Sequence, residues 1–185
     1  MARAAFIDRD GVINEDRAYV HRIADFKLIP GAADALRALR DAGFLLVVIT
    51  NQSGIARGMF SEADYHTLDT YMRERLSEAG VVLDSVQYCP HLPDAEVEQY
   101  RRDCECRKPR AGMIREAAAL LNINTSQSVL IGDRRSDLQA GRAAGVGRCF
   151  LVRSGQALSD SDTRAADGVF DDLADCVAEL LKSGG

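Results

Sequence analysis

The sequence predicts an α/β fold in which helices cover a doubly wound parallel sheet. Short apolar runs alternate along the chain with stretches of helical periodicity, the order expected of strand–helix–strand units. Phe44 to Ile49 is an unbroken apolar run, typical of a strand that is covered on both faces. Hydrophobic residues make up 46% of the 185 positions and charged residues 28%, with no internal repeat or linker. We therefore expect one domain spanning residues 1–185.

Apolar spacing and its punctuation define the elements of the first half of the chain. Pro30 and Gly31 precede a helical stripe that Gly43 ends, and Ser61 is a good N-cap for a longer helix. A polar stretch without steady periodicity predicts a loop or flap rather than a separate domain. In chain order we expect a strand at 4–7, this flap at 14–27, a helix at 32–39, a strand at 44–49, a helix at 61–79 and a strand at 82–88.

The second half of the chain resumes the alternation after an unusual connection. Residues 89–109 are irregular and rich in cysteine, proline and charge, and they are too many for an ordinary connection between elements. Gly145 ends the helix that precedes the fifth strand. We expect a helix at 113–121, a strand at 129–131, a helix at 136–144, a strand at 146–152, a polar surface segment at 154–168 and a closing helix at 173–181.

Charge and hydropathy exclude several classes of partner. The net charge of −5 gives no general attraction to nucleic acid or to anionic membranes, so any anion-binding site must be local. The longest apolar run is far too short to cross a bilayer. Asp8 and Asp10 interrupt the stretch in which a signal peptide would need its apolar segment. We therefore expect a cytoplasmic protein that binds neither nucleic acid nor membrane, with a monomer as the default state.

Three of the predicted strands end in groups that can carry chemistry. Because parallel strands point their carboxyl ends to one edge of the sheet, these groups should meet there. Two carboxylates held close together repel each other unless a cation lies between them or one of them keeps a proton. Mg²⁺ is a cation that prefers oxygen ligands. A D-x-D-G turn taken alone is equally compatible with an ordinary solvated turn. The groups are Asp8 and Asp10 after the first strand, Thr50 and Asn51 after the second, and Asp133 with Asp137 after the fourth.

Two cations close the irregular segment of residues 89–109. Arg107 and Lys108 stand just before Pro109 and the start of a predicted helix. Together with the hydroxyl of Thr50 and free backbone N–H groups, Lys108 would stabilise a phosphoryl group during its transfer.

These residues resemble, in order, the four motifs of the haloacid dehalogenase-like (HAD) hydrolases. The resemblance implies that Asp8 is a nucleophile that forms an aspartyl-phosphate, while Asp10 acts first as acid and then as base. It implies Mg²⁺ bound by the carboxylates of Asp8 and Asp133 and the backbone carbonyl of Asp10, with Asp137 supporting the metal indirectly. Thr50 and Lys108 would stabilise the phosphoryl group. The matching segments are Asp8-Arg9-Asp10-Gly11, Thr50-Asn51-Gln52-Ser53-Gly54, Lys108-Pro109 and Gly132-Asp133-x-x-x-Asp137.

A second group of candidate ligands lies within residues 89–109. Cys89-x-His91 and Cys104-x-Cys106 supply three thiolates and one imidazole, a set that suits a closed tetrahedral Zn²⁺ site. Such a site leaves no open position for a substrate, so we expect a structural zinc ion that orders this segment. The alternative is a chance cluster of core cysteines, which the polarity of the segment disfavours.

The remaining cysteines and histidines have ordinary explanations. Cys149 and Cys176 stand in apolar surroundings and are expected to be small core residues. His21 and His66 are expected on the surface.

Within the HAD hydrolases, the chain resembles the branch that holds the D-glycero-D-manno-heptose 1,7-bisphosphate 7-phosphatases and the related histidinol-phosphatase domains. The resemblance rests on D-R-D-G-V-I-N from Asp8, the flap residues 16–20, T-N-Q-S-G-I-A-R-G from Thr50 and the two cysteine motifs. It implies removal of the 7-phosphate in nucleotide-activated heptose biosynthesis, at a site without a cap domain. The substrate contacts that it implies are Asp16, Arg17, Ala18, Tyr19, Asn51, Gln52, Ser53 and Lys108, with Arg107 and Arg134 on the second phosphate.

Two departures and three alternatives accompany this resemblance. Relatives often carry Lys where this chain has Arg134, and His where it has Leu92. Histidinol phosphate or another small sugar phosphate is the nearest alternative substrate. A phospho-receiver domain would need its acceptor aspartate after the third strand, where this chain has Tyr88 and Cys89. A zinc-bearing interaction module would not need the complete set of catalytic groups.

Overall fold

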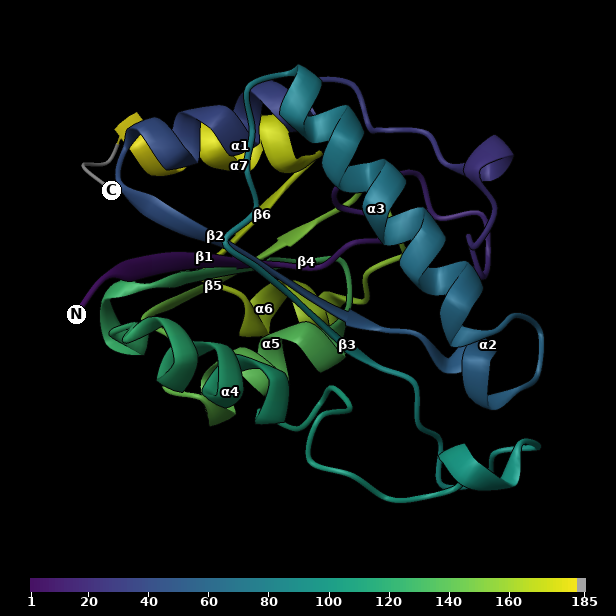
Figure 1. Cartoon of the computed structure of the whole chain (residues 1–185). Coiled ribbons are helices and arrows are strands. Elements are labelled where there is room, and N and C mark those ends of the chain that lie inside the picture. Colours follow the sequence, from purple (N-terminus) through teal and green to yellow (C-terminus); the bar gives the residue numbers. More distant parts are fainter. Residues whose placement is uncertain (183–185) are drawn as a thin grey trace.

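The computed structural model describes residues 1–182, and within them the strands form a single parallel sheet (Figure 1). The strands are β1 (Arg3–Ile7), β2 (Phe44–Asn51), β3 (Ser85–Cys89), β4 (Val129–Gly132), β5 (Arg148–Val152) and β6 (Gly168–Phe170). Their order is β3-β2-β1-β4-β5-β6, and each neighbouring pair is parallel. The predicted α/β class with a doubly wound parallel sheet is confirmed.

Helices cover both faces of this sheet. They are α1 (Ala32–Asp41), α2 (Ser53–Ala56), α3 (Glu62–Glu78), α4 (Gly112–Leu121), α5 (Arg135–Ala143), α6 (Asp160–Ala165) and α7 (Leu173–Lys182). Apolar side chains of α1, α3 and α7 form the core on one face, and those of α4 and α5 form it on the other (Figure 1). In residues 1–182, no helix is both long enough and apolar enough to cross a membrane.

The unbroken apolar run of β2 is explained by this layered arrangement. Leu46, Val47, Val48 and Ile49 are all fully buried, and their side chains alternate between the two cores. A strand that is half exposed would instead alternate polar and apolar residues. Residues 44–49 do not alternate polar and apolar side chains because both faces of this strand are covered, as predicted.

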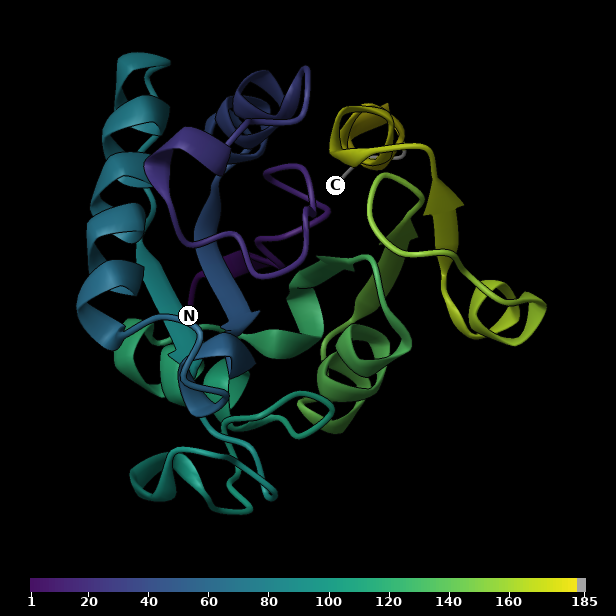
Figure 2. The same ribbon diagram turned by 90° about the vertical axis from the view of Figure 1, so that its right-hand side faces the viewer.

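The reversal of winding at β1 determines where a ligand can bind. β1 lies between β2 and β4, so the chain builds the sheet outward in one direction and then continues on the other side of β1. Ligands of open α/β sheets bind at such a reversal, beyond the carboxyl ends of the strands. Figure 2 looks onto this edge and shows the flap of residues 14–27 (purple) and the segment of residues 89–109 (teal) on its two sides.

The longest helix begins where the sequence predicts. Ser61 is its N-cap: the Ser61 hydroxyl accepts a hydrogen bond from the backbone N–H of Asp64, and the Asp64 carboxylate accepts one from the N–H of Ser61. This reciprocal capping box satisfies two donors that the first turn of a helix leaves free.

Several short elements differ from the prediction. β3 begins at Ser85 rather than at residue 82, because its pairing with β2 begins at Ser85, while Val82 is half exposed in the irregular segment after α3. The helix α2 was not predicted. The segment of residues 154–168 is not entirely irregular, since it contains α6 and the start of β6. A capping box at Ser159 and Asp162 starts α6, and that pattern is present in the sequence. β6 has only three residues, all half-buried, and so carries no clear pattern.

Candidate active site

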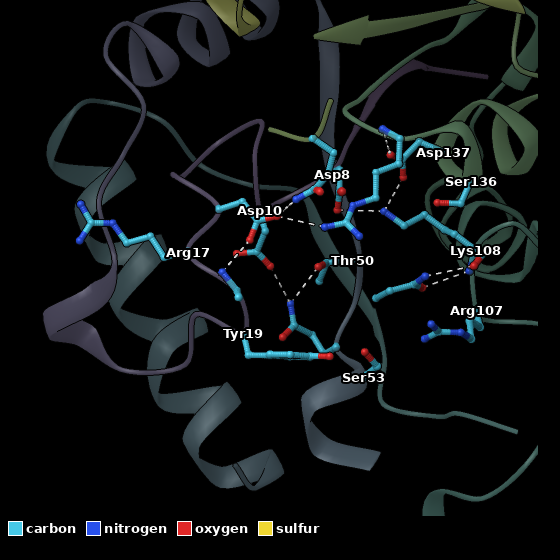
Figure 3. Close-up of a pocket in the computed structure, with 16 residues that line it drawn as sticks. Asp8, Asp10, Arg17, Tyr19, Thr50, Ser53, Arg107, Lys108, Ser136 and Asp137 are labelled. Atoms are coloured by element: carbon cyan, nitrogen blue, oxygen red, sulfur yellow. Dashed lines mark hydrogen bonds and ion pairs between the residues drawn. The ribbon is translucent and has the colours of Figure 1, made fainter. Parts of the chain in front are cut away.

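A cavity of about 700 Å³ lies at the carboxyl edge of the sheet (Figure 3). Its walls come from the first motif, the flap, the end of β2, the segment before α4 and the start of α5. The lining residues are Asp8, Asp10, Asp16, Arg17, Ala18, Tyr19, Thr50, Asn51, Gln52, Ser53, Arg107, Lys108, Arg134, Ser136, Asp137 and Gln156. Every residue expected to contact the substrate is among them. Asp133 is fully buried and does not line the cavity.

Lys108 is a buried cation between two carboxylates. Its Nζ lies 2.8 Å from Asp8 Oδ1 and 2.7 Å from Asp137 Oδ1, and it donates a hydrogen bond to the Ile49 carbonyl at 2.9 Å. Asn51 holds the backbone of Lys108 in place: its Nδ2 donates to the Lys108 carbonyl at 3.1 Å, and its Oδ1 accepts from the Lys108 N–H at 3.0 Å. Asn51 therefore positions Lys108, a role that the sequence did not suggest.

Three carboxylates meet beside this single ammonium group. One oxygen each of Asp8, Asp133 and Asp137 lies within 4.8 Å of the others, and all three residues are buried. When they are ionised, their charges sum to −3, and Lys108 supplies +1. Repulsion within such a group disfavours ionisation unless a further cation is bound. A divalent cation that prefers oxygen ligands has the charge that this group lacks.

One oxygen of Asp133 has no hydrogen-bond donor. Asp133 Oδ1 is buried and accepts no hydrogen bond from the part of the chain that the structure describes, and Arg134 Nε approaches it only to 3.5 Å. Its other oxygen accepts from the backbone N–H of Gln156 at 3.0 Å. A buried carboxylate oxygen without a donor is unfavourable, and coordination to a metal removes the cost. The donor set therefore fits Mg²⁺, with Asp8 and Asp133 as its carboxylate ligands.

Burial and mutual repulsion shift the pKa values in this group. Burial is the main cause that raises the pKa of Asp8 to about 8, with Asp137 and Asp133 adding to the rise and Lys108 opposing it. Burial, with Asp137, likewise raises the pKa of Asp133 to about 6. Burial disfavours the charge on Lys108, but Asp137 and Asp8 outweigh that effect and raise its pKa. Such coupled shifts are typical of functional sites.

The carboxylate of Asp10 lies outside the group formed by Asp8, Asp133 and Asp137. We expected the side chains of Asp8 and Asp10 to converge, because residues two apart in an extended segment point the same way. β1 ends at Ile7, however, and the chain bends at Arg9, so that rule does not apply. The guanidinium of Arg9 pairs with Asp10 at 3.0 Å.

The side chains of Asn14 and Gln52 complete the surroundings of Asp10. Asn14 Nδ2 donates to Asp10 Oδ1 at 2.9 Å, and Gln52 Nε2 donates to Asp10 Oδ2 at 3.2 Å. Gln52 Nε2 also donates to the hydroxyl oxygen of Thr50 at 2.9 Å, which links the first two motifs. The carboxylate of Asp10 still borders the cavity, so it can exchange a proton with a bound molecule.

Gly11 is required by the closeness of Asp133. Its φ is +86°, in the left-handed region that favours glycine. A Cβ at this position would lie 2.5 Å from Asp133 Oδ2. The glycine of the first motif therefore allows the turn after β1 to pass directly over the tip of β4.

The four candidate zinc ligands lie together at the end of β3. The Sγ atom of Cys106 lies 3.0 Å from that of Cys89 and 3.2 Å from that of Cys104, and Cys89 and Cys104 are 3.5 Å apart. His91 Nδ1 lies 3.3 Å from Cys106 Sγ. Ligands at about 2.3 Å from a tetrahedral zinc ion lie about 3.8 Å apart, so these atoms converge as the ligands of one ion do.

The other cysteines and histidines behave largely as expected. Cys149 and Cys176 are free and fully buried in the two cores. His66 is exposed, as predicted. His21 is instead half-buried, because its ring stacks on that of Phe60 at 4.8 Å.

Four polar residues near the cavity had no predicted role. Arg9 and Asn14 stand inside a motif, yet the pattern gives no indication that their side chains hold Asp10. Ser136 and Gln156 line the cavity from the start of α5 and from the segment after β5. No signal in the sequence distinguishes them from surface residues, because their positions depend on loop geometry.

Comparison with known proteins gives evidence of the family that does not depend on the geometry of the site. Residues 105–176 match the model of the HAD-hydrolase-like family. The chain is 48% identical over 179 residues to the D-glycero-beta-D-manno-heptose-1,7-bisphosphate 7-phosphatase of Escherichia coli O6:H1, covering 97% of this chain and 94% of the relative. It is also 48% identical, over 95% of this chain and 96% of the relative, to the protein of the same name from Haemophilus ducreyi.

A solved structure is similar over the whole described chain. It is the D,D-heptose 1,7-bisphosphate phosphatase of B. bronchiseptica complexed with magnesium and phosphate. Its TM-score is 0.84 at 32% sequence identity, and the similarity covers 98% of this chain and 99% of that one.

Proposed function

The chain belongs to the family of D-glycero-β-D-manno-heptose-1,7-bisphosphate 7-phosphatases among the HAD-like hydrolases, and from this premise we propose that it removes the 7-phosphate of that sugar bisphosphate. The observation that carries the proposal is the buried group of Asp8, Asp133, Asp137 and Lys108 at the floor of the cavity. It combines a nucleophile, a phosphate-binding cation and the ligands of a dication. Phosphomonoester hydrolysis needs these three components, because the phosphoryl group carries negative charge throughout.

Asp8 and Asp10 divide the chemistry between them in this proposal. A carboxylate oxygen of Asp8 attacks phosphorus, the bond from phosphorus to the sugar oxygen breaks, and Asp10 gives its proton to that oxygen. Water then attacks the aspartyl-phosphate, Asp10 accepts a proton from the water, and inorganic phosphate leaves. Splitting the reaction through a covalent intermediate lowers the barrier of each step. Lys108 and the hydroxyl of Thr50 stabilise the phosphoryl oxygens in both steps.

Mg²⁺ fits the acidic group, with the carboxylates of Asp8 and Asp133 and the backbone carbonyl of Asp10 as its proposed protein ligands. When bound, it would neutralise charge on the phosphoryl oxygens. Asp137 contacts Lys108 and the backbone N–H of Arg134, so it supports the group without binding the metal directly.

Zn²⁺ fits the second cluster as a structural ion held by Cys89, His91, Cys104 and Cys106. All four positions are then filled by protein, which leaves none for a substrate water. Its proposed effect on catalysis is positional, because Arg107 and Lys108 follow the last ligand directly.

The remainder of the cavity provides contacts for the sugar and the second phosphate. We propose that Asp16, Arg17, Ala18 and Tyr19 of the flap, with Gln52 and Ser53, contact the heptose. Arg107 and Arg134 approach the cavity from different segments, and a guanidinium suits bidentate contact with phosphate. We further propose that the chain acts as a single domain and as a monomer in the cytoplasm, where thiols such as its five cysteines remain reduced.

Phosphate release in the presence of Mg²⁺ tests the proposed function. We expect kcat/KM for the β-anomer of D-glycero-D-manno-heptose 1,7-bisphosphate to exceed that for histidinol phosphate by at least about 100-fold, because a site built for polar contacts discriminates strongly against ligands that lack them. The released product should be the 1-phosphate, as identified by ³¹P NMR. A preference for histidinol phosphate would reject the proposed substrate but not the phosphatase chemistry.

A further inference from the structure

Gln156 occupies a position that no motif explains. It lies in the connection between β5 and α6, residues 153–159, and lines the cavity beside the flap of residues 14–27. We infer that Gln156 is a positioning residue that fixes this flap relative to the metal-binding carboxylate Asp133. The inference rests on the proposed function and adds a specificity-determining residue to it.

The backbone of this connection is seated directly against Asp133. The hydroxyl of Ser154 donates to the carbonyl of Gly11 at 2.7 Å, and the N–H of Gln156 donates to Asp133 Oδ2 at 3.0 Å. A Cβ on Gly155 would lie 2.0 Å from the same carboxylate oxygen, so only glycine allows this approach. The position of the connection is therefore determined by the first motif and by Asp133.

The side chain of Gln156 extends from that anchor to the flap. Its Nε2 donates to Asp16 Oδ2 at 2.6 Å, across 140 positions of sequence. Arg134 Nη2 contacts the same oxygen at 3.0 Å. The Asp16 side chain is only 10% exposed, so these two donors replace most of its hydrogen bonds to water. Gln156 thus links Asp133 to the flap: its backbone N–H binds Asp133, and its side chain binds Asp16.

The flap needs such a link because its backbone is strained. Ala18 and Tyr19 are consecutive non-glycine residues with φ of +56° and +57°, a region that residues with a Cβ rarely adopt. The other oxygen of Asp16 accepts a hydrogen bond from the N–H of Ala18 at 3.0 Å. The Asp16 carboxylate therefore holds the strained turn from one side, while Gln156 and Arg134 hold the carboxylate from the other.

Gln156 has a role that Arg134 cannot fill alone. Arg134 is half exposed and is the residue proposed to bind the second phosphate of the substrate. Once its guanidinium turns to that phosphate, the neutral amide of Gln156 remains as the donor to Asp16. The flap then stays in position while the substrate is bound, with Ala18 and Tyr19 still against the cavity.

The variants Gln156→Ala and Gln156→Glu test this role by steady-state kinetics. Both keep the backbone N–H that binds Asp133, and Glu has nearly the shape of Gln but places a carboxylate against Asp16. We expect KM for the heptose bisphosphate to rise about tenfold in Q156A and further in Q156E, with a much smaller change in kcat, because losing a hydrogen bond to a charged group lowers the population of the ordered, binding-competent flap by about this factor. Gln139→Ala on the exposed side of α5 is the matched control and should behave as the parent.

Two further measurements separate this role from a merely structural one. Limited trypsin digestion should cleave after Arg17 or Arg22, both exposed in the flap, several-fold faster in Q156A than in the parent. In a double-mutant cycle, adding Gln156→Ala to the Asp16→Ala variant should not change KM further, because the two residues act as one unit.

The outcomes that overturn the inference are distinct from those that reject the proposed function. An unchanged KM in Q156A and Q156E overturns it, whatever the proteolysis rate. A raised Mg²⁺ requirement at unchanged KM also overturns it, since Gln156 would then act through Asp133 alone. If the parent does not hydrolyse the heptose bisphosphate, the proposed substrate fails, and the proteolysis comparison still tests the link between Gln156 and the flap.

Discussion

The side chain of Arg9, between Asp8 and Asp10 in sequence, holds Asp10 in place. Its guanidinium is almost completely buried and pairs with the Asp10 carboxylate at 3.0 Å. It also donates to the carbonyl of Val20 at 2.8 Å and lies 5.9 Å from the centre of the Tyr65 ring. The D-R-D pattern predicts the two acids, but it gives no indication that the arginine turns inward. That depends on the flap, whose carbonyl takes part in holding it.

Replacing Arg9 should be costly for stability. Arg9→Met leaves the Asp10 carboxylate without its buried cation, and breaking such a pair typically costs about 3 kcal/mol. Urea unfolding followed by circular dichroism measures the loss. Arg75→Met, which removes an exposed pair with Glu78, should cost about 0–1 kcal/mol. Equal losses in the two variants would contradict the role assigned to Arg9.

Asp8 is the residue on which turnover should depend most strongly. A carboxamide cannot attack phosphorus, so Asp8→Asn should lower phosphate release by at least about 10⁴-fold. The fold should persist without loss of stability in the absence of Mg²⁺, because a neutral carboxamide suits a crowded buried group in which the ionised form of Asp8 is disfavoured. Phosphate release and thermal melting check both parts. Asp34→Asn, on the exposed side of α1, should retain full activity. Substantial phosphatase activity in D8N would exclude Asp8 as the nucleophile.

The elements of the fold were predictable in proportion to their length and burial. The continuous apolar run of β2 and the capping pattern at Ser61 identify a central strand and the longest helix from local sequence alone. The three-residue β6 lacks such a signal, because all of its residues are half-buried and its place in the sheet depends on pairing with β5. The link from Gln156 to Asp16 was likewise not predictable, since it joins two loops whose approach is decided by the whole sheet.

Residues 89–109 were predicted as an irregular segment ordered by zinc rather than by a core. The apolar contacts within it are few: Leu92 and Ala95 pack with Ala56 and the ring of Tyr100. Its last proposed ligand, Cys106, is followed directly by Arg107 and Lys108, so the proposed zinc site and the proposed phosphate-binding cation share one stretch of backbone.

Removing zinc should therefore weaken both stability and catalysis. Treatment with a zinc chelator should lower the melting temperature and also kcat, because Lys108 loses its fixed backbone; structural zinc typically contributes about 10–16 kcal/mol of apparent binding energy in small modules. Re-addition of Zn²⁺ should restore both values. Cys149→Ala, which changes a core thiol outside the cluster, should leave the zinc content at the parent level. Full activity and an unchanged melting temperature in chelated protein would show that the two sites are not coupled.

At the scale of the molecule, the fold concentrates negative charge at the carboxyl ends of the strands. The tips of β1 and β4 bring Asp8 and Asp133 together from positions 125 apart in sequence, and α5 adds Asp137. A folded chain that buries these groups raises their pKa values, as described for Asp8 and Asp133. The cost of this arrangement is a stability that depends on pH and on the metal.

Mg²⁺ should stabilise the protein more at high pH than at low pH. The folded, metal-free chain binds protons at Asp8 and Asp133 more tightly than the unfolded chain, because their pKa values rise from 3.8 to about 8 and about 6. The contribution of this proton binding to the free energy of unfolding is complete below about pH 4 and is lost as the pH rises through the folded-state pKa values. Mg²⁺ replaces the protons, so the increase in melting temperature on adding Mg²⁺ should grow from pH 5 to pH 8. The same increase at both pH values, or one that persists in Asp8→Asn, would contradict this account.

The insertion of β4 beside β1 has a consequence for how the protein is made. During synthesis, β1, β2 and β3 leave the ribosome before β4 exists, so the nascent chain exposes one edge of β1 while its first acidic motif is already present. Asp133 and the cavity residues that follow it, Arg134, Ser136, Asp137 and Gln156, are translated after the other groups around the cavity. A polypeptide stalled before residue 133 therefore carries Asp8 without its proposed partner ligand, and the acidic group can bind its dication only after β4 has been translated.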